Sequence, residues 1–476
     1  MRNLRSLVAL AALVVFQPAS FAAPGLILPG DGVIGRNLEV FATVRLAEPA
    51  PAAGLDVTIT SDDPTRLLLS EGPVKAGSKS ITLKVKAQYV ETPDFYIQAL
   101  GDSGTATYTV TAPGLPSANG SVTLGRSALI IAGPFGGVVF RTTTGAPAKL
   151  TITSAVLDSA GNPGQQQAIA GGLNIKAELL SSDAKVGAAT PVAVTLAGGA
   201  TSAVAEFTPA GVGKTSLTVK LPPGFSTPAQ FASVAATVDL PGIGLMGEIN
   251  LGKDLQVQGV VLLGEPAPAK GLDVKLTSED PKRMLLSTQI DKTGSSSVTI
   301  HVSGGESRVP YYIQSLADSG TIEYTATAPG YRTRTAPVTL TPSGVMVVYS
   351  PYGAPDEAEF LRAKQTIDPR PFTTSLAEHK PLHLALWTVY LDPKTMRGAD
   401  MTAQRLRPGV TAAVELDNSN PAVAKIARSV TVSSASEFAM TEFVPVSPGQ
   451  TVISAHTPPG FSTPSNATSV TATVKE

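Results

Sequence analysis

The chain has 476 residues, enough for several hydrophobic cores, because a single domain usually holds roughly 100 to 200 residues. Charged residues make up only 15% of the sequence and the formal net charge is −1, so the chain lacks the basic field that would hold nucleic acid or an anionic membrane surface. Its 44 Gly and 39 Pro are typical of short strands joined by tight turns.

The first 22 residues have the pattern of a secretory signal peptide. Arg2 and Arg5 precede an apolar run at 7–16, and small residues follow, ending at Ala22. The run is shorter than the roughly 20 apolar residues that a membrane-spanning helix needs. We therefore expect cleavage after Ala22, export to the periplasm, the cell surface or the medium, and no transmembrane segment in the mature chain.

A first kind of unit, A, occurs twice. The segment GLDV at 54–57 returns at 271–274, and DPTRLLLS at 63–70 returns as DPKRMLLS at 280–287. Internal repetition of this kind indicates duplicated structural units.

A second kind of unit, B, follows each A. Its mark is PPGFSTP at 222–228, which returns at 458–464. The expected order is therefore A-B-A-B after the signal peptide. The four predicted domains cover 23–126, 127–238, 239–344 and 345–476.

Alternating apolar and polar residues between turn signals predict half-buried strands throughout unit A. In the segment 104–112, Ala106, Tyr108, Val110 and Ala112 share one face, which we expect to pack on a core. The candidate strands of the first A unit are 38–46, 55–61, 67–70, 80–87, 95–100, 104–112 and 120–124. Seven short strands in about 100 residues predict an all-β immunoglobulin-like sandwich. The chain has no Cys, so four separate cores held by packing and strand pairing are expected.

The sequence resembles the bacterial immunoglobulin-like repeats of invasin- and intimin-type surface proteins. The resemblance lies in segments 61–70, 278–281, 419–424 and 207–219. The resemblance implies a tandem array of β-sandwiches. It also implies that these domains act as rigid spacers, adhesive tips or carbohydrate-binding modules.

Four short patterns resemble chemical sites but fit turns or surface positions better. The segment 211–215 (GVGKT) lacks the first Gly and the helix of a phosphate-binding loop. Ser103 has no His in its domain to accept a proton. His379 and His383 lack further metal ligands, so we expect them on the surface. Asp62 and Asp63 could supply oxygen ligands to Ca²⁺. They precede a proline in a turn, however, where an Asp side chain commonly hydrogen-bonds to its own backbone instead.

The last B unit contains an insertion near 354–370 that the first B unit lacks, and loops accept insertions at little cost. Trp387, the single Trp, follows it and is predicted on the outward face of its strand. Either the insertion covers this side chain or a ligand contacts it. Tyr390, Tyr349 and Tyr352 are the other candidate ligand contacts.

No nucleophile, base and orienting group assemble on a predicted strand end, so we expect no enzyme, no catalytic residues, no cofactor and no metal. The predicted function is that of an adhesive and spacer array at the surface or in the medium, with a protein or glycan partner. The alternatives are an array that binds carbohydrate or another ligand, and a component of periplasmic assembly.

Overall fold

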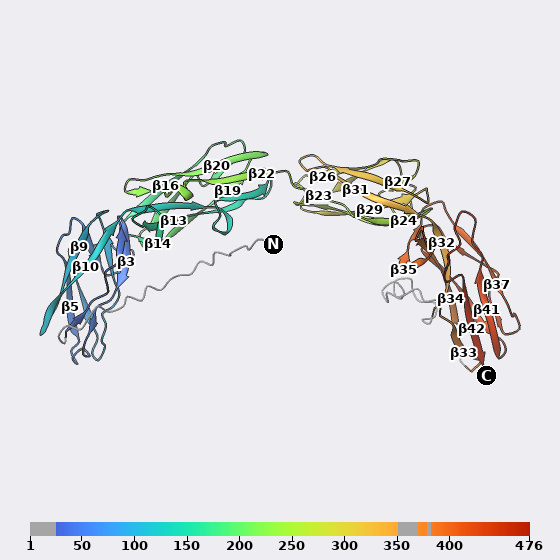
Figure 1. The fold of residues 1–476 in the computed structure, drawn as a ribbon, viewed down its shortest axis with the longest axis horizontal. Helices are drawn as coiled ribbons and strands as arrows, with labels where there is room; N and C mark the ends of the chain where they lie inside the picture. Colours follow the sequence, from blue (N-terminus) through green and yellow to red (C-terminus); the bar gives the residue numbers. More distant parts are fainter. Residues whose placement is uncertain (1–24, 351–369, 378–381) are drawn as a thin grey trace. The chain divides into compact units, whose positions relative to one another are not determined.

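The computed structural model describes residues 25–350, 370–377 and 382–476 (Figure 1). Within these ranges the ordered elements are strands and two single turns of 3-10 helix, η1 (Pro134–Gly136) and η2 (Ala229–Phe231). The expected all-β, multidomain sandwich fold is confirmed. The chain divides into two compact units, here called unit 1 (up to Leu240) and unit 2 (from Pro241).

The first sandwich of unit 1 has one sheet in the order β2-β10-β9-β5-β7 and a facing sheet with β3-β8-β6. Its strands are β1 (Leu26–Ile27), β2 (Val33–Gly35), β3 (Leu38–Ala42), β4 (Arg45–Leu46), β5 (Leu55–Ser61), β6 (Leu67–Ser70), β7 (Ser80–Val85), β8 (Phe95–Ala99), β9 (Thr105–Ala112) and β10 (Leu115–Gly125). The predicted inward face of β9 is confirmed, because all four of its apolar side chains are buried.

The second sandwich of unit 1 pairs the sheet β17-β19-β13-β11-β21 with the sheet β12-β22-β20-β16-β18. Its strands are β11 (Ser127–Ala132), β12 (Val139–Thr143), β13 (Ala148–Leu157), β14 (Pro163–Gln166), β15 (Ala168–Ile169), β16 (Asn174–Ser181), β17 (Gly187–Thr190), β18 (Ala193–Ala197), β19 (Ser202–Pro209), β20 (Gly213–Lys220), β21 (Phe225–Ser226) and β22 (Val234–Asp239). The GVGKT segment enters β20 and not a helix, as expected.

The first sandwich of unit 2 repeats the plan, with sheets β23-β25-β29-β27 and β24-β31-β30-β26-β28. Its strands are β23 (Ile243–Gly244), β24 (Ile249–Gly252), β25 (Leu255–Leu263), β26 (Leu272–Ser278), β27 (Met284–Ser287), β28 (Ser297–Val302), β29 (Arg308–Ser315), β30 (Thr321–Thr327) and β31 (Arg334–Thr341).

The second sandwich of unit 2 has sheets β32-β34-β40-β38 and β33-β42-β41-β37-β39. Its strands are β32 (Ser343–Ser350), β33 (Phe372–Ser375), β34 (Leu382–Leu391), β35 (Gly398–Ala403), β36 (Arg405–Leu406), β37 (Ala412–Asn418), β38 (Ala424–Lys425), β39 (Ser429–Val432), β40 (Phe438–Pro445), β41 (Gly449–Ala455) and β42 (Ser469–Lys475).

One strand pairing is common to all four sandwiches. A short strand near the start of each runs parallel to the last strand of the same sheet, in the pairs β2–β10, β12–β22, β24–β31 and β33–β42. All the other pairings in the longer sheets are antiparallel, apart from β11–β21. Two facing sheets closed in this way have the immunoglobulin-like arrangement.

The cores are not four separate clusters. Leu38, on a strand of the first sandwich, packs in the core of the second. In unit 2 a single cluster joins Leu255 of the first sandwich to Val345, Leu386 and Leu406 of the second. The expectation of four independent cores is therefore wrong for unit 2, because alternation along a strand predicts which face is buried but not which domain buries it.

The predicted strand at 38–46 is divided into β3 and β4. At the break, the backbone N–H of Val44 donates to the side-chain oxygen of Thr92 at 3.0 Å, and the N–H of Thr92 donates back to the carbonyl of Val44. A side chain thus replaces one strand partner, which a pattern of alternating residues cannot reveal.

Candidate functional site at the joint of each unit

Trp387 is 7% exposed, so it lies in a packed environment and not on an open face. It lies opposite Met346 in the β32–β34 pair, and its ring centroid is 4.8 Å from that of Phe438. Val348 and Ala385 belong to the same buried cluster. The insertion near 354–370, one of the two predicted contacts of Trp387, falls mostly outside the described residues, so the choice between cover and ligand contact stays open.

The other candidate aromatic contacts do not join Trp387. Tyr349 and Tyr390 lie on the opposite face of the β32–β34 pair, and each is half-buried. The ring of Tyr349 stacks on Phe372, with centroids 4.1 Å apart. Tyr352 lies outside the described residues. The structure therefore does not gather the described members of this set on a common surface.

The short polar patterns form turns. The carboxylate of Asp63 accepts from the backbone N–H and the hydroxyl of Thr65, and these bonds hold its pKa below the ordinary value. Asp62 accepts from the hydroxyls of Thr107 and Thr109. His379 lies outside the described residues, and His383 is buried in β34, so its predicted surface position is wrong. Both faces of β34 are buried, unlike those of a strand with one side in water.

The two sandwiches of unit 1 share a sheet. Strand β15 of the second sandwich pairs antiparallel with β3 of the first, with Ala168 opposite Glu39. The backbone N–H of Ala170 extends this contact by donating to the carbonyl of Asn37 at 2.9 Å. We call the contact through these strands the joint of unit 1.

A buried glutamine fixes the joint of unit 1. Its side-chain oxygen, Gln167 Oε1, accepts the backbone N–H of Gly35 at 2.9 Å. Its nitrogen, Nε2, donates to the carbonyl of Val33 at 2.6 Å. One side chain of the second sandwich thereby satisfies two backbone groups of the first, 132 and 134 residues earlier in the chain.

Unit 2 repeats the joint. Strand β36 pairs antiparallel with β25, and the oxygen of Gln404 accepts the N–H of Gly252 at 3.0 Å. Its nitrogen donates to the carbonyl of Asn250 at 2.6 Å. An ion pair between Arg407 and Asp254, with N and O atoms 2.6 Å apart, adds to this joint. We call Gln167 and Gln404 the joint glutamines.

The two joints differ at one buried position. Glu39 is 2% exposed, and its Oε2 accepts from Gln98 Nε2 at 2.9 Å and from the N–H of Gly171 at 2.8 Å. Its Oε1 has no hydrogen-bond partner. Burial, only partly offset by the two hydrogen bonds, raises the pKa of Glu39 to about 6.

In unit 2 the same position holds an amide. Gln256 accepts from Gln314 Nε2 at 3.1 Å and donates to the carbonyls of Ile290 and Leu406. The residue that corresponds to Gly171 is Pro408, which has no N–H to satisfy. Unit 1 therefore has a carboxylate oxygen of Glu39 facing the N–H of Gly171. Unit 2 has neither group: Gln256 offers an amide donor, and Pro408 has no N–H.

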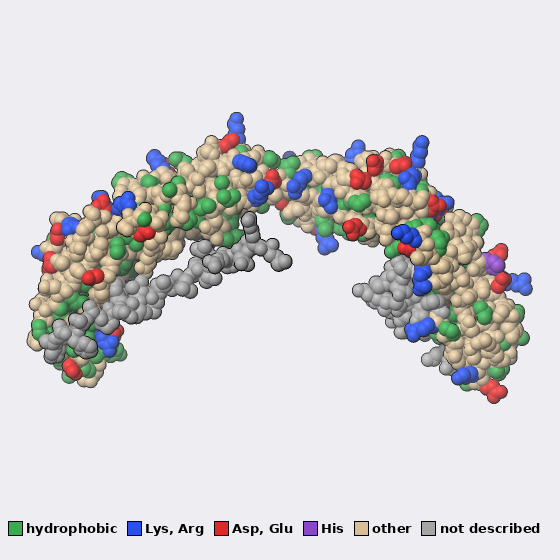
Figure 2. Space-filling model, viewed as in Figure 1, with side chains coloured by type: hydrophobic (Ala, Val, Ile, Leu, Met, Phe, Trp, Pro, Cys, Tyr) green, Lys and Arg blue, Asp and Glu red, His purple; other side chains and the backbone are tan. Residues whose placement is uncertain are grey.

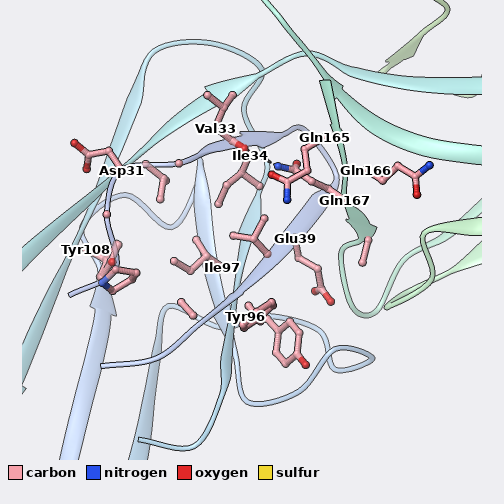
Figure 3. Close-up of a pocket in the computed structure, with 18 of the residues that line it drawn as sticks. Asp31, Val33, Ile34, Glu39, Tyr96, Ile97, Tyr108, Gln165, Gln166 and Gln167 are labelled. Carbon is pink, nitrogen blue, oxygen red and sulfur yellow. Dashed lines mark hydrogen bonds between the residues drawn. The ribbon is translucent and has the colours of Figure 1, made fainter. Parts of the chain in front are cut away.

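A cavity of about 670 Å³ lies beside the joint of unit 1 (Figure 3). Its apolar walls include Ile34, Ile97 and Val122, and its polar groups include Asp31 and Tyr108. In Figure 3 Asp31 and Tyr108 lie on one side of the cavity, away from the glutamines. This volume is within the range of roughly 300 to 1,000 Å³ that small-molecule sites occupy.

Tyr108 has no hydrogen-bond partner among the described residues, although it is only 1% exposed. In unit 2 the hydroxyl of the corresponding Tyr324 lies 2.6 Å from that of Tyr311 and donates to the carbonyl of Met246 at 2.9 Å. Phe95 stands at the position of Tyr311 in unit 1, so that partner is missing. Burial, and then the carboxylate of Asp31, raise the pKa of Tyr108 above its ordinary range, so the hydroxyl keeps its proton at neutral pH.

The surface carries mixed charges. On the face that Figure 2 shows, Lys and Arg side chains are interspersed with Asp and Glu side chains along both units. Within the described ranges no cluster of three or more His, Cys, Asp or Glu side chains could hold a metal ion. The same part of the chain has no helix long and apolar enough to cross a membrane.

No protein-family model matches the chain, and no curated protein sequence matches it. The resemblance to bacterial immunoglobulin-like repeats stays a prediction. Among solved structures, 141 chains show some similarity.

Three of these are glycoside hydrolases. A beta-glycosidase from Bacteroides vulgatus is 9% identical over 45% of this chain and 25% of that chain, with a TM-score of 0.17. A glycosyl hydrolase family 2 member from Bacteroides cellulosilyticus is 11% identical over 45% of this chain and 28% of that chain, also at 0.17. A beta-glucuronidase from glycoside hydrolase family 2 is 9% identical over 62% of this chain and 39% of that chain, again at 0.17. The chain thus spans well under half the length of each, and likeness at this level carries no argument about its activity.

Proposed function

We propose that this chain is a non-catalytic exported protein that acts as an adhesive and spacer at the cell surface or in the medium. The observation that carries the proposal is the repeated joint, in which a buried joint glutamine and a shared sheet connect two sandwiches in each unit. A spacer must hold its parts at a fixed separation, and backbone pairing between domains does so better than a flexible linker.

The two joints also argue for a structural role through their chemistry. Their polar groups are directed at backbone N–H and carbonyl groups of the neighbouring sandwich and not into an open cleft. Such bonds fix geometry, because a buried backbone group left without a partner costs free energy.

Export is tested by expressing the full chain in a bacterium with an epitope after Glu476. We expect the recovered protein to begin at Ala23 and the epitope to be digested by protease added to intact or outer-membrane-permeabilised cells. A matched chain that lacks residues 2–22 should stay intact in the cytosol. Recovery of the full chain, uncleaved and protected inside the cell, would contradict the proposal.

One observation favours a second function, that of a ligand-binding array. The cavity in unit 1 has the size of a small-molecule site, and it is lined by Tyr108, whose hydroxyl has no hydrogen-bond partner among the described residues.

A further inference from the structure

The cavity in unit 1 differs from the corresponding region of unit 2 in the hydrogen bonding of one tyrosine hydroxyl. Tyr108 lacks the two hydrogen bonds that satisfy Tyr324. Tyr108 lines an open cavity, so a ligand there can supply a hydrogen bond that no described residue makes.

The position of Tyr108 is fixed by its neighbours. It lies opposite Gly120 in the β9–β10 pair, and a side-chain carbon on Gly120 would lie 2.4 Å from the hydroxyl oxygen. Because Gly120 has no side chain, the ring and hydroxyl of Tyr108 can lie across the neighbouring strand β10. The hydroxyl is held at this wall by the fold and does not depend on a flexible side chain.

The charge of the cavity lining is negative. Among the described residues, Asp31 and Glu39 are the charged members of the lining, and no described Lys or Arg belongs to it. Asp31 is exposed, and one of its carboxylate oxygens accepts from the hydroxyl of Ser121, which leaves the other without a partner among the described residues. A lining of this charge favours a cation over an anion.

The remaining walls are apolar or aromatic. Ile34, Ile97 and Val122 are buried residues that line the cavity. Phe41, which is 50% exposed, lies opposite Tyr96 in the β3–β8 pair. These two rings lie on the side of the cavity that holds Glu39 (Figure 3) and add aromatic surface for an apolar group of a ligand.

We propose that this cavity binds a small primary amine that carries an apolar group. The ammonium donates to the carboxylate of Asp31 and to the hydroxyl oxygen of Tyr108, and the apolar group packs against Ile97 and Val122. This binding function goes beyond the spacer role, and it belongs to unit 1 alone. In unit 2 the position of Phe41 is taken by Gln258 and the hydroxyl of Tyr324 is already bonded.

The test uses the full chain and a pair of probes matched in shape and opposite in charge, 2-phenylethylamine and 3-phenylpropionate. Titration calorimetry should show one site for the amine and no binding of the carboxylate. Asp31→Asn should weaken amine binding about tenfold or more, since a hydrogen bond to a charged group contributes about 1.5 to 3 kcal/mol. Tyr108→Phe keeps the ring and should weaken binding severalfold.

Glu248→Gln is the matched control, because Glu248 corresponds to Asp31 in unit 2, and it should leave amine affinity unchanged. Near-ultraviolet circular dichroism of each variant checks that unit 1 is folded. Equal binding of the two probes would overturn the proposal. So would amine binding that both unit 1 variants retain in full, or the absence of amine binding to the folded wild-type chain.

Discussion

Glu39 and Gln256 occupy equivalent positions at the two joints and meet different neighbours. In unit 1 the backbone N–H of Gly171 needs an acceptor, and the carboxylate supplies one. In unit 2 Pro408 has no N–H, and an amide donor is used instead. The cost of the carboxylate is a buried oxygen without a partner.

Replacing Glu39 by Gln should stabilise unit 1 at neutral pH. The pKa of Glu39 is raised from 4.5 to about 6 in the folded chain, so the folded state binds more protons than the unfolded state between these values. Stability therefore falls as the pH rises through this window, by up to about 2 kcal/mol. Urea unfolding of Glu39→Gln at about pH 7.5 should show this gain, and at about pH 4 the variant should equal the wild type.

The reciprocal variant, Gln256→Glu, is the control. It places a carboxylate oxygen against the carbonyls of Ile290 and Leu406, so it should destabilise unit 2 more at about pH 7.5 than at about pH 4. If Glu39→Gln destabilised unit 1 equally at both pH values, the buried carboxylate would be a net source of stability and the argument would be wrong.

Truncating Trp387 should cost stability. The side chain is buried against Met346 and Phe438, and large-to-small changes at such sites cost about 3 to 5 kcal/mol. Trp387→Ala should therefore lower the unfolding midpoint of unit 2. The control Val444→Ala, at a 45% exposed position of β40, should change stability by less than about 0.5 kcal/mol. A fully stable Trp387→Ala chain that lost binding to a polysaccharide would instead place Trp387 in a ligand site.

At the scale of the strands, local alternation predicts the inward faces well. The segments 55–61 and 67–70 are strands with the predicted bounds, and β9 buries its apolar side chains as expected. The short strands β2 and β15 were not predicted, because each is held by partners more than 85 residues away in the chain. Pairing over such distances leaves no periodic signal in a segment of two or three residues.

The joint glutamines could not be predicted from local pattern either. Gln167 and its partners in the first sandwich are 132 and 134 residues apart in the chain.

The unpaired tyrosine of the cavity, by contrast, can be found from the sequence by comparing the two A units. Aligning the two A units places Phe95 against Tyr311, and this exchange removes the hydroxyl that satisfies the buried tyrosine in unit 2.

Removing a joint glutamine should loosen one joint. Gln167→Ala leaves the N–H of Gly35 and the carbonyl of Val33 without partners, at a cost of about 1 to 3 kcal/mol. Hydrogen exchange should show faster exchange at Gly35 in the variant. The neighbouring exposed Gln166→Ala is the control and should leave this amide protected. Unchanged protection of Gly35 in Gln167→Ala would show that strand pairing alone holds the joint.

At the scale of the whole molecule, the chain is two compact units, each with its own joint. The cores of the two sandwiches meet at each joint, through Leu38 in unit 1 and through Leu255 and Leu406 in unit 2. The shared sheet and the buried glutamine of each joint, together with the merged core of unit 2, indicate that each pair of sandwiches moves as one body. A spacer built from such pairs has fewer flexible connections than it has sandwiches.

The most direct test measures the distance across each joint by pulsed electron spin resonance. The chain has no Cys, so spin labels can be added only where they are wanted. The pairs are Thr82→Cys with Thr195→Cys in unit 1 and Thr299→Cys with Thr431→Cys in unit 2, at exposed and corresponding strand positions. We predict one narrow distance distribution for each pair, broadened in unit 1 by Gln167→Ala. A broad distribution in the wild-type chain would contradict a rigid pair of sandwiches.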